Sequence, residues 1–243
     1  MHRFFLLPDQ CRGDSLQLDG REAHHALDVL RLRPGDAVSV LDGAGSEYEC
    51  EVARAEKRAL TLTVRQKRLH PPPPCRVTLA LAIPKGKIIE SILQKATELG
   101  VFSVVPLLTE RVATRLDDVA AADKAAKWRQ VVIEAIKQCG QPWLPQVAPP
   151  IPIIDYLRDK TPFDLSLVGS LQGDGRHPRT YFTSRPASVR LWIGPEGDFT
   201  PAELDAIRAS GAKPITLGPL TLRVETAALY SLALVNYEVT SGL

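Results

Sequence analysis

The sequence predicts an α/β fold in which a parallel sheet follows a smaller β-rich domain. Apolar and charged residues alternate over residues 48–52 and 60–64, as in half-buried strands. Four prolines at positions 71–74 form a stiff spacer that cannot join a sheet. After them, an apolar run, a helical pattern and a second apolar run follow in order, which is typical of a parallel strand pair with a crossover helix. We therefore expect a small β-barrel over residues 1–70 and a larger α/β domain over residues 75–243.

The individual elements follow from the period of the apolar residues. In the first domain the pattern predicts a short helix over residues 22–30 and a strand over residues 37–41. In the second domain it predicts strands over 77–83, 101–107 and 165–168, and helices over 88–99 and 123–139. Gly100 stands where a glycine commonly ends a helix.

Two strand–loop–helix units, each with a glycine–proline loop, follow each other near the C-terminus. Residues 191–193 lead into Gly194-Pro195-Glu196-Gly197, and residues 215–217 lead into Gly218-Pro219. The carboxyl ends of parallel strands meet at one edge of a sheet, where α/β folds bind ligands. The two loops therefore predict a binding site.

The helix after each loop can also be placed. Thr200, Pro201 and Glu203 fit a capping box with proline at the first helical position, so this helix begins directly after the first loop and Gly211 closes it. Residues 224–239 form a helix that is apolar on most sides, which predicts burial inside the domain or at a subunit contact.

Composition limits the class of protein. The 243 residues carry 30 basic and 28 acidic side chains, a net charge of +2 that is too small to indicate nucleic-acid binding by bulk electrostatics. No apolar run reaches the length of a membrane span and the N-terminal stretch lacks a signal-peptide pattern, so we expect a cytoplasmic protein. The four cysteines are scattered, which predicts reduced, mostly buried thiols and no metal site.

The chemistry of the loops argues against a phosphate ligand. Neither phosphate-binding glycine pattern is present, and Glu196 puts a carboxylate into the first loop, where it would repel an anion. This carboxylate either binds a cationic group or accepts a hydrogen bond from a ribose hydroxyl of a ligand, or it only caps a local amide group.

Several cations have two interpretations. Lys85 and Lys87 stand at the start of a predicted helix, where positive charge is unfavourable by about 0.3–1 kcal/mol each, so they are either solvated or contact a phosphate backbone. His25 and Arg31 either contribute to a basic surface on the first domain or serve only in packing and solvation.

At this point the motifs resemble those of a known family. The chain is similar over nearly its whole length to the RsmE family, bacterial methyltransferases of the SPOUT superfamily that act on a uridine of small-subunit ribosomal RNA. The shared motifs are Ile193-Gly194-Pro195-Glu196-Gly197-Asp198-Phe199, Leu217-Gly218 with Leu222-Arg223 and Glu225-Thr226-Ala227, His25 with Val29-Leu30-Arg31, Gly35-Asp36, Lys85-Gly86, Lys95-Ala96-Thr97-Glu98-Leu99-Gly100, and Glu134-Ala135 with Gln138.

The resemblance implies a fold and a set of ligands. It implies a PUA-like N-terminal β-barrel that helps to bind 16S ribosomal RNA, and a SPOUT-type α/β domain whose end is threaded through a deep trefoil knot. It implies a homodimer that binds S-adenosylmethionine in the knot loops, with no metal. The cofactor-binding residues by this carry-over are Gly194, Pro195, Glu196, Gly197, Leu217, Gly218, Pro219 and Leu222, and the RNA-binding candidates are His25, Arg31, Lys85 and Lys87.

The implied reaction is methyl transfer to ring nitrogen 3 of a specific uridine. That nitrogen carries a weakly acidic proton, so either a base removes the proton or a cation stabilises the anion that forms. Arg223 is the candidate for the second role, and a salt bridge to Glu225 is its structural alternative. The identity of the proton acceptor and of the target nucleotide stays open.

Three residues depart from the family pattern. Leu220 and Gln141 stand where many members carry arginine, and Asp198 stands where glycine is common. These departures weaken the residue-level prediction on the RNA side. A non-catalytic RNA-binding assembly factor with the same fold is the alternative function, and an unrelated nucleotide-dependent α/β enzyme is a third possibility.

Overall fold

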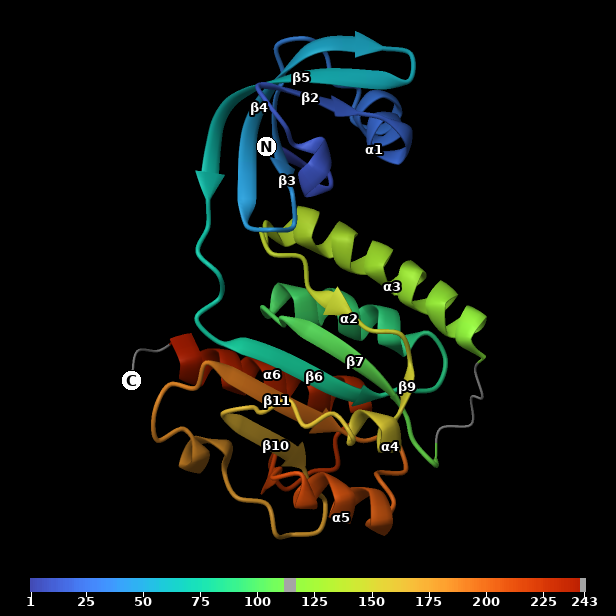
Figure 1. Ribbon diagram of the computed structural model, residues 1–243, viewed down its shortest axis with the longest axis vertical. Coiled ribbons are helices and arrows are strands. Elements are labelled where there is room, and N and C mark those ends of the chain that lie inside the picture. The colour runs from blue at the N-terminus through green and yellow to red at the C-terminus, as the bar shows by residue number, and fades with distance from the viewer. Residues whose placement is uncertain (112–116, 241–243) are drawn as a thin grey trace. The chain divides into compact units, whose positions relative to one another are not determined.

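The computed structural model describes residues 1–111 and 117–240, and the chain divides into two compact units (Figure 1). The first unit contains Met1–Pro72 and Ile133–Leu144, and the second contains Pro73–Val132 and Pro145–Leu243. The long helix α3, Asp118–Cys139, contributes residues to both.

The first unit is built on a five-stranded sheet in the order β1-β3-β4-β5-β2. β1 pairs in parallel with β3, and the other neighbours are antiparallel. Tyr48, Cys50 and Val52 of β4 are buried at alternate positions, so the predicted alternation is confirmed. The strands are β1 His2–Phe5, β2 Ser15–Leu18, β3 Ala37–Leu41, β4 Ser46–Glu56 and β5 Ala59–Leu69, and a short 3-10 helix, η1, spans Pro8–Gln10.

The single helix predicted over residues 22–30 is wrong in its form. The structure has an α-helix, α1 Gly20–His24, followed directly by one π-helical turn, η2 His25–Val29. A π-turn holds more residues per turn than an α-helix and shifts the faces of the residues after it. Ala23 and Ala26 are buried against the sheet, and the apolar pattern alone did not distinguish the two helix types.

The segment Ile133–Leu144 packs within the first unit through an apolar contact and a buried cation. Ile133 and Ile136 form a small core with Phe5. The buried Lys137 ammonium donates to Glu22 at 2.8 Å and to Glu134 at 3.0 Å. A buried charge requires such partners, so this network fixes the end of α3 within the unit.

The second unit contains a seven-stranded sheet in the order β12-β10-β11-β6-β7-β8, with β9 also paired to β7. Each of these pairings is parallel, which confirms the predicted parallel sheet. The strands are β6 Arg76–Ala82, β7 Ser103–Leu108, β8 Gln146–Val147, β9 Ile151–Pro152, β10 Leu165–Gly169, β11 Ser188–Ile193 and β12 Lys213–Ile215.

The last strand ends earlier than the sequence pattern predicts. β12 stops at Ile215, and the backbone turns at Thr216, whose hydroxyl accepts a hydrogen bond from the Gly218 amide at 3.2 Å. A threonine side chain that bonds the backbone two residues ahead starts a turn. Leu217 therefore belongs to the loop.

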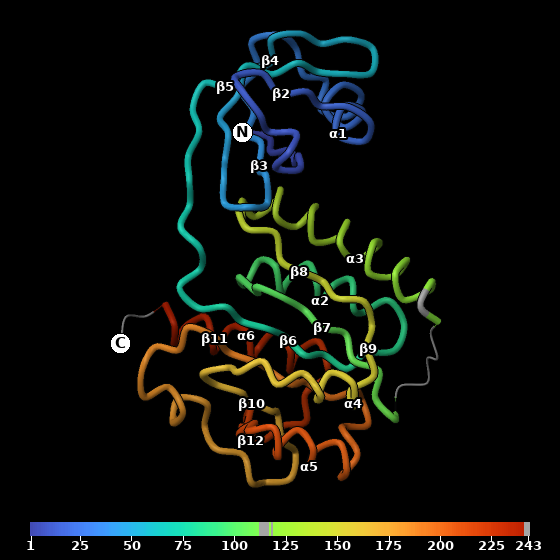
Figure 2. Tube along the Cα trace, viewed as in Figure 1, coloured from blue at the N-terminus to red at the C-terminus, as the bar shows by residue number. Residues whose placement is uncertain are grey.

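Helices cover both faces of this sheet (Figures 1 and 2). α4 Ile153–Tyr156 and α5 Pro201–Ala209 share a core with strand residues such as Trp192. α2 Ile88–Glu98 and α6 Val224–Thr240 contact each other, and α6 packs on β11 and β6. A 3-10 helix, η3 Pro178–Tyr181, lies between β10 and β11 in the chain.

The predicted helix signals are confirmed. Thr200 Oγ1 accepts from the Glu203 amide at 3.3 Å, and the Glu203 carboxylate accepts from the Thr200 amide at 2.9 Å, which is the predicted capping box. Gly100 and Gly211 follow α2 and α5 with φ of +75° and +94°. Only glycine adopts these values without strain.

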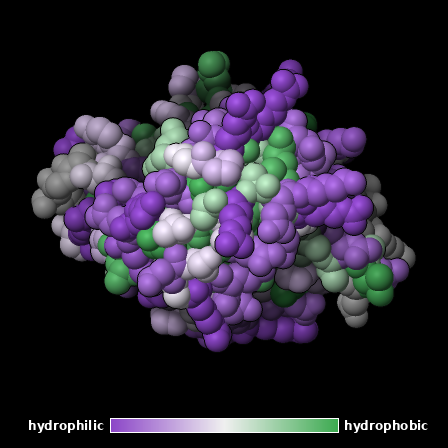
Figure 3. Space-filling view, turned by 90° about the horizontal axis from the view of Figure 1, so that it is seen from above, coloured by the Kyte–Doolittle hydropathy of each residue, from purple (hydrophilic) through white to green (hydrophobic). Residues whose placement is uncertain are grey.

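The outer surface is mostly polar. Hydrophilic residues dominate the face seen in Figure 3, and apolar residues lie among them in small groups. Among the residues that the structure describes, none of the helices combines the length and apolar character needed to cross a membrane.

Asp198, in the loop after β11, is one of two non-glycine residues described with positive φ, here +63°. Its Oδ1 accepts a hydrogen bond from the Phe199 amide at 2.8 Å. Short polar side chains that bond the local backbone are the non-glycine residues that tolerate this conformation best.

Replacing Asp198 tests this backbone conformation with a matched pair of variants. Asp198→Ala loses the hydrogen bond and keeps the strain, whereas Asp198→Gly removes the strain. We expect the alanine variant to be about 1 kcal/mol less stable than the glycine variant in urea unfolding. Equal free energies of unfolding for the two variants would show that the loop does not hold a left-handed residue here.

Candidate active site

A cavity of about 490 Å³ lies at the carboxyl ends of β10, β11 and β12 in the second unit. Three loops line it, one from the end of each strand, together with the first turn of α6. Its lining residues are Ile88, Gly169, Ser170, Leu171, Ile193, Gly194, Pro195, Glu196, Asp198, Leu217, Gly218, Leu220, Thr221, Leu222, Arg223, Val224, Glu225 and Ala227. The parallel sheet therefore brings both glycine–proline loops to one site, as predicted.

The first loop is held by the segments after β6 and β7. Glu196 accepts a hydrogen bond from the Lys85 amide at 3.0 Å, so its carboxylate caps a backbone amide group while it also lines the cavity. Arg111 donates to the Gly197 carbonyl, and Glu203 accepts from the Glu110 amide at 2.8 Å. These contacts fix the loop from outside the cavity, which leaves its inner face available.

Gly194 is required at the start of the first loop because no space exists for a side chain. A Cβ there would lie 2.9 Å from Asp198 Oδ1 and 3.2 Å from the Phe199 amide nitrogen. The Phe199 ring is buried in the core with Trp192, so the backbone beside it cannot yield. The loop folds tightly over the strand end as a result.

The second loop depends on a different property of glycine. Gly218 has φ of +110°, and a Cβ there would meet nothing within 4 Å. The requirement is therefore conformational, since L-residues rarely adopt this value. The loop ends where Arg223 caps α6, its carbonyl accepting from the Ala227 amide at 2.8 Å.

The charges around the cavity are mainly acidic. Glu196, Asp198 and Glu225 contribute three carboxylates, and Arg223 is the cation among the lining residues. Within the described chain, Arg223 forms no ion pair, and the predicted alternative of a salt bridge to Glu225 is not observed. Arg223 is exposed.

The remaining lining is apolar or backbone. Leu217 and Leu222 are half-buried, while Leu171 and Leu220 are exposed at the rim. A cavity of this size, with apolar walls and a few polar groups, suits a small organic ligand. The described residues contain no group of three His, Cys, Asp or Glu side chains that could hold a metal ion.

The structure brings together most, but not all, of the predicted cofactor residues. Gly194, Pro195, Glu196, Leu217, Gly218 and Leu222 line the cavity with Arg223, whereas Gly197 and Pro219 are not among the lining residues. Gly169, Ser170 and Leu171 line it without having been predicted. They could have been found from the strand predicted over residues 165–168, because that strand ends at the same edge of the sheet and these residues follow it.

The RNA-binding candidates lie outside this cavity. Lys87 precedes α2 and is exposed, and Lys85 is held by its backbone to Glu196. In the first unit, the half-buried His25 ring packs edge-on against Phe4 with a centroid distance of 6.1 Å. Arg31 is exposed and has φ of +56°.

Comparison with known proteins places the chain in a family. The model of the RNA methyltransferase domain matches residues 71–236, and that of the RNA methyltransferase PUA domain matches residues 18–65. Ribosomal RNA small subunit methyltransferase E of Synechocystis is 32% identical, with 97% of this chain and 77% of that protein covered. The protein of the same name from Bacillus subtilis is 30% identical, with 92% and 90% covered.

Solved structures are similar over nearly the whole chain. Ribosomal RNA small subunit methyltransferase E from Neisseria gonorrhoeae, bound to S-adenosylmethionine, has a TM-score of 0.85 and 30% identity, with 96% of each chain covered. A protein from Legionella pneumophila, solved with bound S-adenosylmethionine, has a TM-score of 0.87 and 30% identity over 96% of each chain. With its RNA methyltransferase and PUA domains, the chain belongs to the ribosomal RNA small subunit methyltransferase E family.

Proposed function

We propose that this protein transfers a methyl group from S-adenosylmethionine to ring nitrogen 3 of a specific uridine in 16S ribosomal RNA. The observation that carries the proposal is the single cavity that both glycine–proline loops line in a chain of this family. The substrate is the small ribosomal subunit or its RNA, and the protein works in the cytoplasm.

The residues of the cavity fit S-adenosylmethionine. When bound, this cofactor supplies an activated methyl group on a positively charged sulfur. Glu196, Asp198 and Glu225 provide negative charge at the cavity, which favours a cation over a phosphate. Leu217 and Leu222 offer apolar surface to an adenine ring, and the backbone of Gly194 and Gly218 can approach the ligand closely because neither residue has a side chain.

Arg223 has the position and charge to assist the reaction. Methylation of nitrogen 3 forms an N–C bond and releases the N–H proton, so negative charge develops on the uracil oxygens. A guanidinium beside the ring stabilises that charge, and the Arg223 guanidinium stands at the cavity without a competing ion pair in the described chain.

The rest of the chain serves substrate binding in this proposal. The first unit, as a PUA-like barrel over residues 1–70, helps to hold the RNA through His25 and Arg31, and Lys85 and Lys87 contribute from the catalytic domain over residues 75–243. The C-terminal loops of that domain form a deep trefoil knot, in keeping with the family resemblance.

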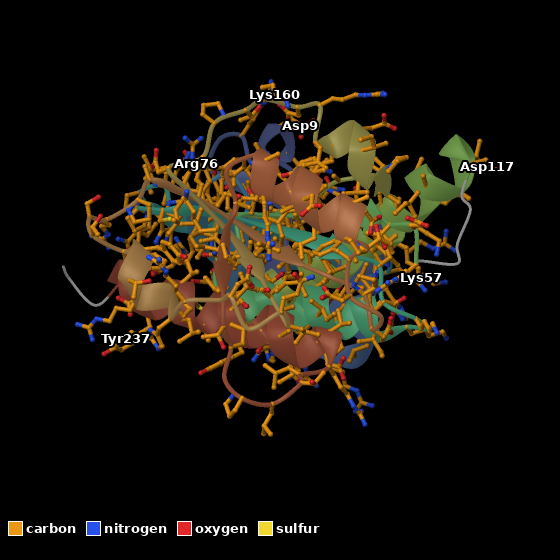
Figure 4. The ribbon with its side chains drawn as sticks, turned by 90° about the horizontal axis from the view of Figure 1, so that it is seen from below. Asp9, Lys57, Arg76, Asp117, Lys160 and Tyr237 are labelled. Carbon is orange, nitrogen blue, oxygen red and sulfur yellow. The ribbon has the colours of Figure 1, made fainter. Side chains whose placement is uncertain are left out.

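The outer face of α6 supports a homodimer. Tyr230, Leu234 and Tyr237 follow each other at helical spacing, and the two tyrosines are 45% and 65% exposed. Figure 4 shows Tyr237, near the end of α6, at the surface. An apolar stripe exposed on a helix marks a contact surface, and a second copy of this chain is the partner that we propose.

Substitution of Gly218 tests the cofactor site. Gly218→Val puts a β-branched residue at φ of +110° and deforms the second loop. We expect at least about a tenfold loss of S-adenosylmethionine affinity in calorimetry. Gly211→Val is the matched control, because it introduces similar strain, at φ of +94°, away from this cavity. Retained affinity in the Gly218 variant, or no heat from the unaltered protein at millimolar cofactor, would overturn the cofactor assignment.

Substitution of Arg223 separates catalysis from cofactor binding. Arg223→Ala should lower the rate of methyl transfer by about a hundredfold, as for loss of one charge-stabilising donor, with S-adenosylmethionine affinity nearly unchanged. Arg185→Ala, at an exposed arginine of the same unit, is the control. Equal losses of rate and affinity would assign Arg223 a structural role.

Introducing a charged side chain on the outer face of α6 tests the proposed dimer. Tyr230→Asp should convert the dimer to monomer in sedimentation velocity, because an aspartate within the stripe would be buried in the dimer contact without a partner. Ile154→Asp, at an exposed apolar residue of α4, should leave the sedimentation coefficient unchanged. A monomeric unaltered protein would contradict the proposal.

A further inference from the structure

A second cavity of about 360 Å³ lies in the same unit at the opposite, amino ends of the strands. Arg190 near the start of β11, Ser166 in β10 and Lys213 at the start of β12 line it, with Leu157, residues 159–165 and the end of α5. It shares no residue with the cavity at the carboxyl ends. The proposed methyl transfer therefore does not account for it.

Arg190 is the central feature of this second cavity, because its side chain is charged and deeply buried. The residue is only 6% exposed, and its guanidinium carbon lies 4.5 Å from the centroid of the Phe163 ring and 5.0 Å from that of Trp192. Arginine commonly stacks on aromatic rings in this way. The rings hold the guanidinium in place but cannot neutralise its charge.

Within the described chain, the hydrogen-bond partners of the Arg190 side chain are the neutral hydroxyl groups of Ser166 and Tyr156, so no anion accepts from it. Its Nε donates to Ser166 Oγ at a long 3.4 Å, and Ser166 also accepts from Trp192 Nε1 at 3.0 Å. Burial raises the pKa of the Tyr156 phenol, against the opposing effect of the Arg190 charge and hydrogen bond, so Tyr156 stays neutral. A guanidinium has five N–H donors, and a buried one is costly unless an anion accepts from it.

The two carboxylates that line the cavity are already engaged. Asp164 Oδ2 accepts from the amides of Ala187 and Ser188 at 2.7 and 3.1 Å. Asp159 Oδ1 accepts from the amide and hydroxyl of Thr161 at 2.9 and 2.6 Å. Within the described chain, neither forms an ion pair with Arg190. The hydrogen bonds from Thr161 lower the pKa of the Asp159 carboxyl and the Arg190 charge contributes further, but among the described residues no carboxylate contacts the guanidinium directly.

Two further cations stand at the opening. Lys213 is exposed, and Lys160 lies at the surface of the unit (Figure 4), its ammonium donating to the Leu157 carbonyl at 3.1 Å. With Arg190 they give three positive charges against the two engaged carboxylates. The balance favours an anion.

We infer that this second cavity binds a small anionic molecule, whose phosphate or carboxylate group accepts hydrogen bonds from Arg190 while Lys160 and Lys213 close over it. The flat guanidinium matches two oxygens of such a group, and its ring contacts keep it preorganised. The site lies apart from the cofactor cavity, so its occupancy does not require S-adenosylmethionine.

The test measures thermal unfolding of the full chain with inorganic phosphate and with malonate, each against chloride at the same ionic strength. A saturable rise in the unfolding temperature above that in chloride is expected, and its size in the two salts distinguishes phosphate from carboxylate recognition. Arg190→Lys keeps the charge but loses the paired donors, and should lower the affinity for the anion by about tenfold. Lys213→Ala changes an exposed position and should lower the same affinity by a smaller factor.

Lys95→Ala is the matched control, since Lys95 is an exposed lysine on α2 of the same unit and does not line the cavity. It should leave the response unchanged. The inference is overturned if phosphate and malonate act no differently from chloride on the unaltered protein. It is also overturned if the Lys213 and Lys95 variants respond identically to the anions, because binding would then lie elsewhere.

Discussion

The parallel alignment of β10, β11 and β12 is the constraint on which the rest of the site depends. Residues Val168 and Trp192 pair in register, and β12 joins the other side of β10, so three strand ends reach one edge together. Each end then opens into a loop whose backbone path is dictated locally: by lack of space at Gly194 and by positive φ at Gly218. The register of the sheet brings the loops together, and the glycines determine the backbone path of each loop.

The loop after β11 is held in place by residues that do not occupy the cavity. Its supports come from residues distant in the sequence, namely the Lys85 amide and Arg111, and from the capping box that starts α5. Neither Lys85 nor Arg111 is among the residues that line the cavity. Glu196 caps the amide group of Lys85, which is distant in the sequence and not local as expected, and it also lines the cavity.

Much of this arrangement could be predicted from the sequence because its determinants are local. The capping box at Thr200, the helix-ending Gly100 and the apolar strands follow from neighbouring residues, and the family motifs identify the two loops. The π-turn at His25–Val29 could not be predicted, since one extra residue in a turn leaves the apolar pattern nearly unchanged. The early end of β12 could not be predicted either, because the turn at Thr216 interrupts a run of apolar residues that reads as a longer strand. Ser170 and Leu171 carry no motif, and their one sequence signal is their place directly after the strand predicted over residues 165–168. The buried Arg190 was missed for a similar reason: a charged residue inside an apolar run becomes informative only when its neighbours are known.

The central claim is that the cavity serves methylation of a uridine in small-subunit ribosomal RNA. The most direct measurement is nucleoside mass spectrometry of 16S ribosomal RNA from cells with and without this protein, followed by incubation of the deficient small subunits with the purified protein and isotope-labelled S-adenosylmethionine. The account predicts that one 3-methyluridine is lost in the deficient cells and that the labelled methyl group restores it. An unchanged nucleoside profile, or a restored methyl group on another atom, would contradict it.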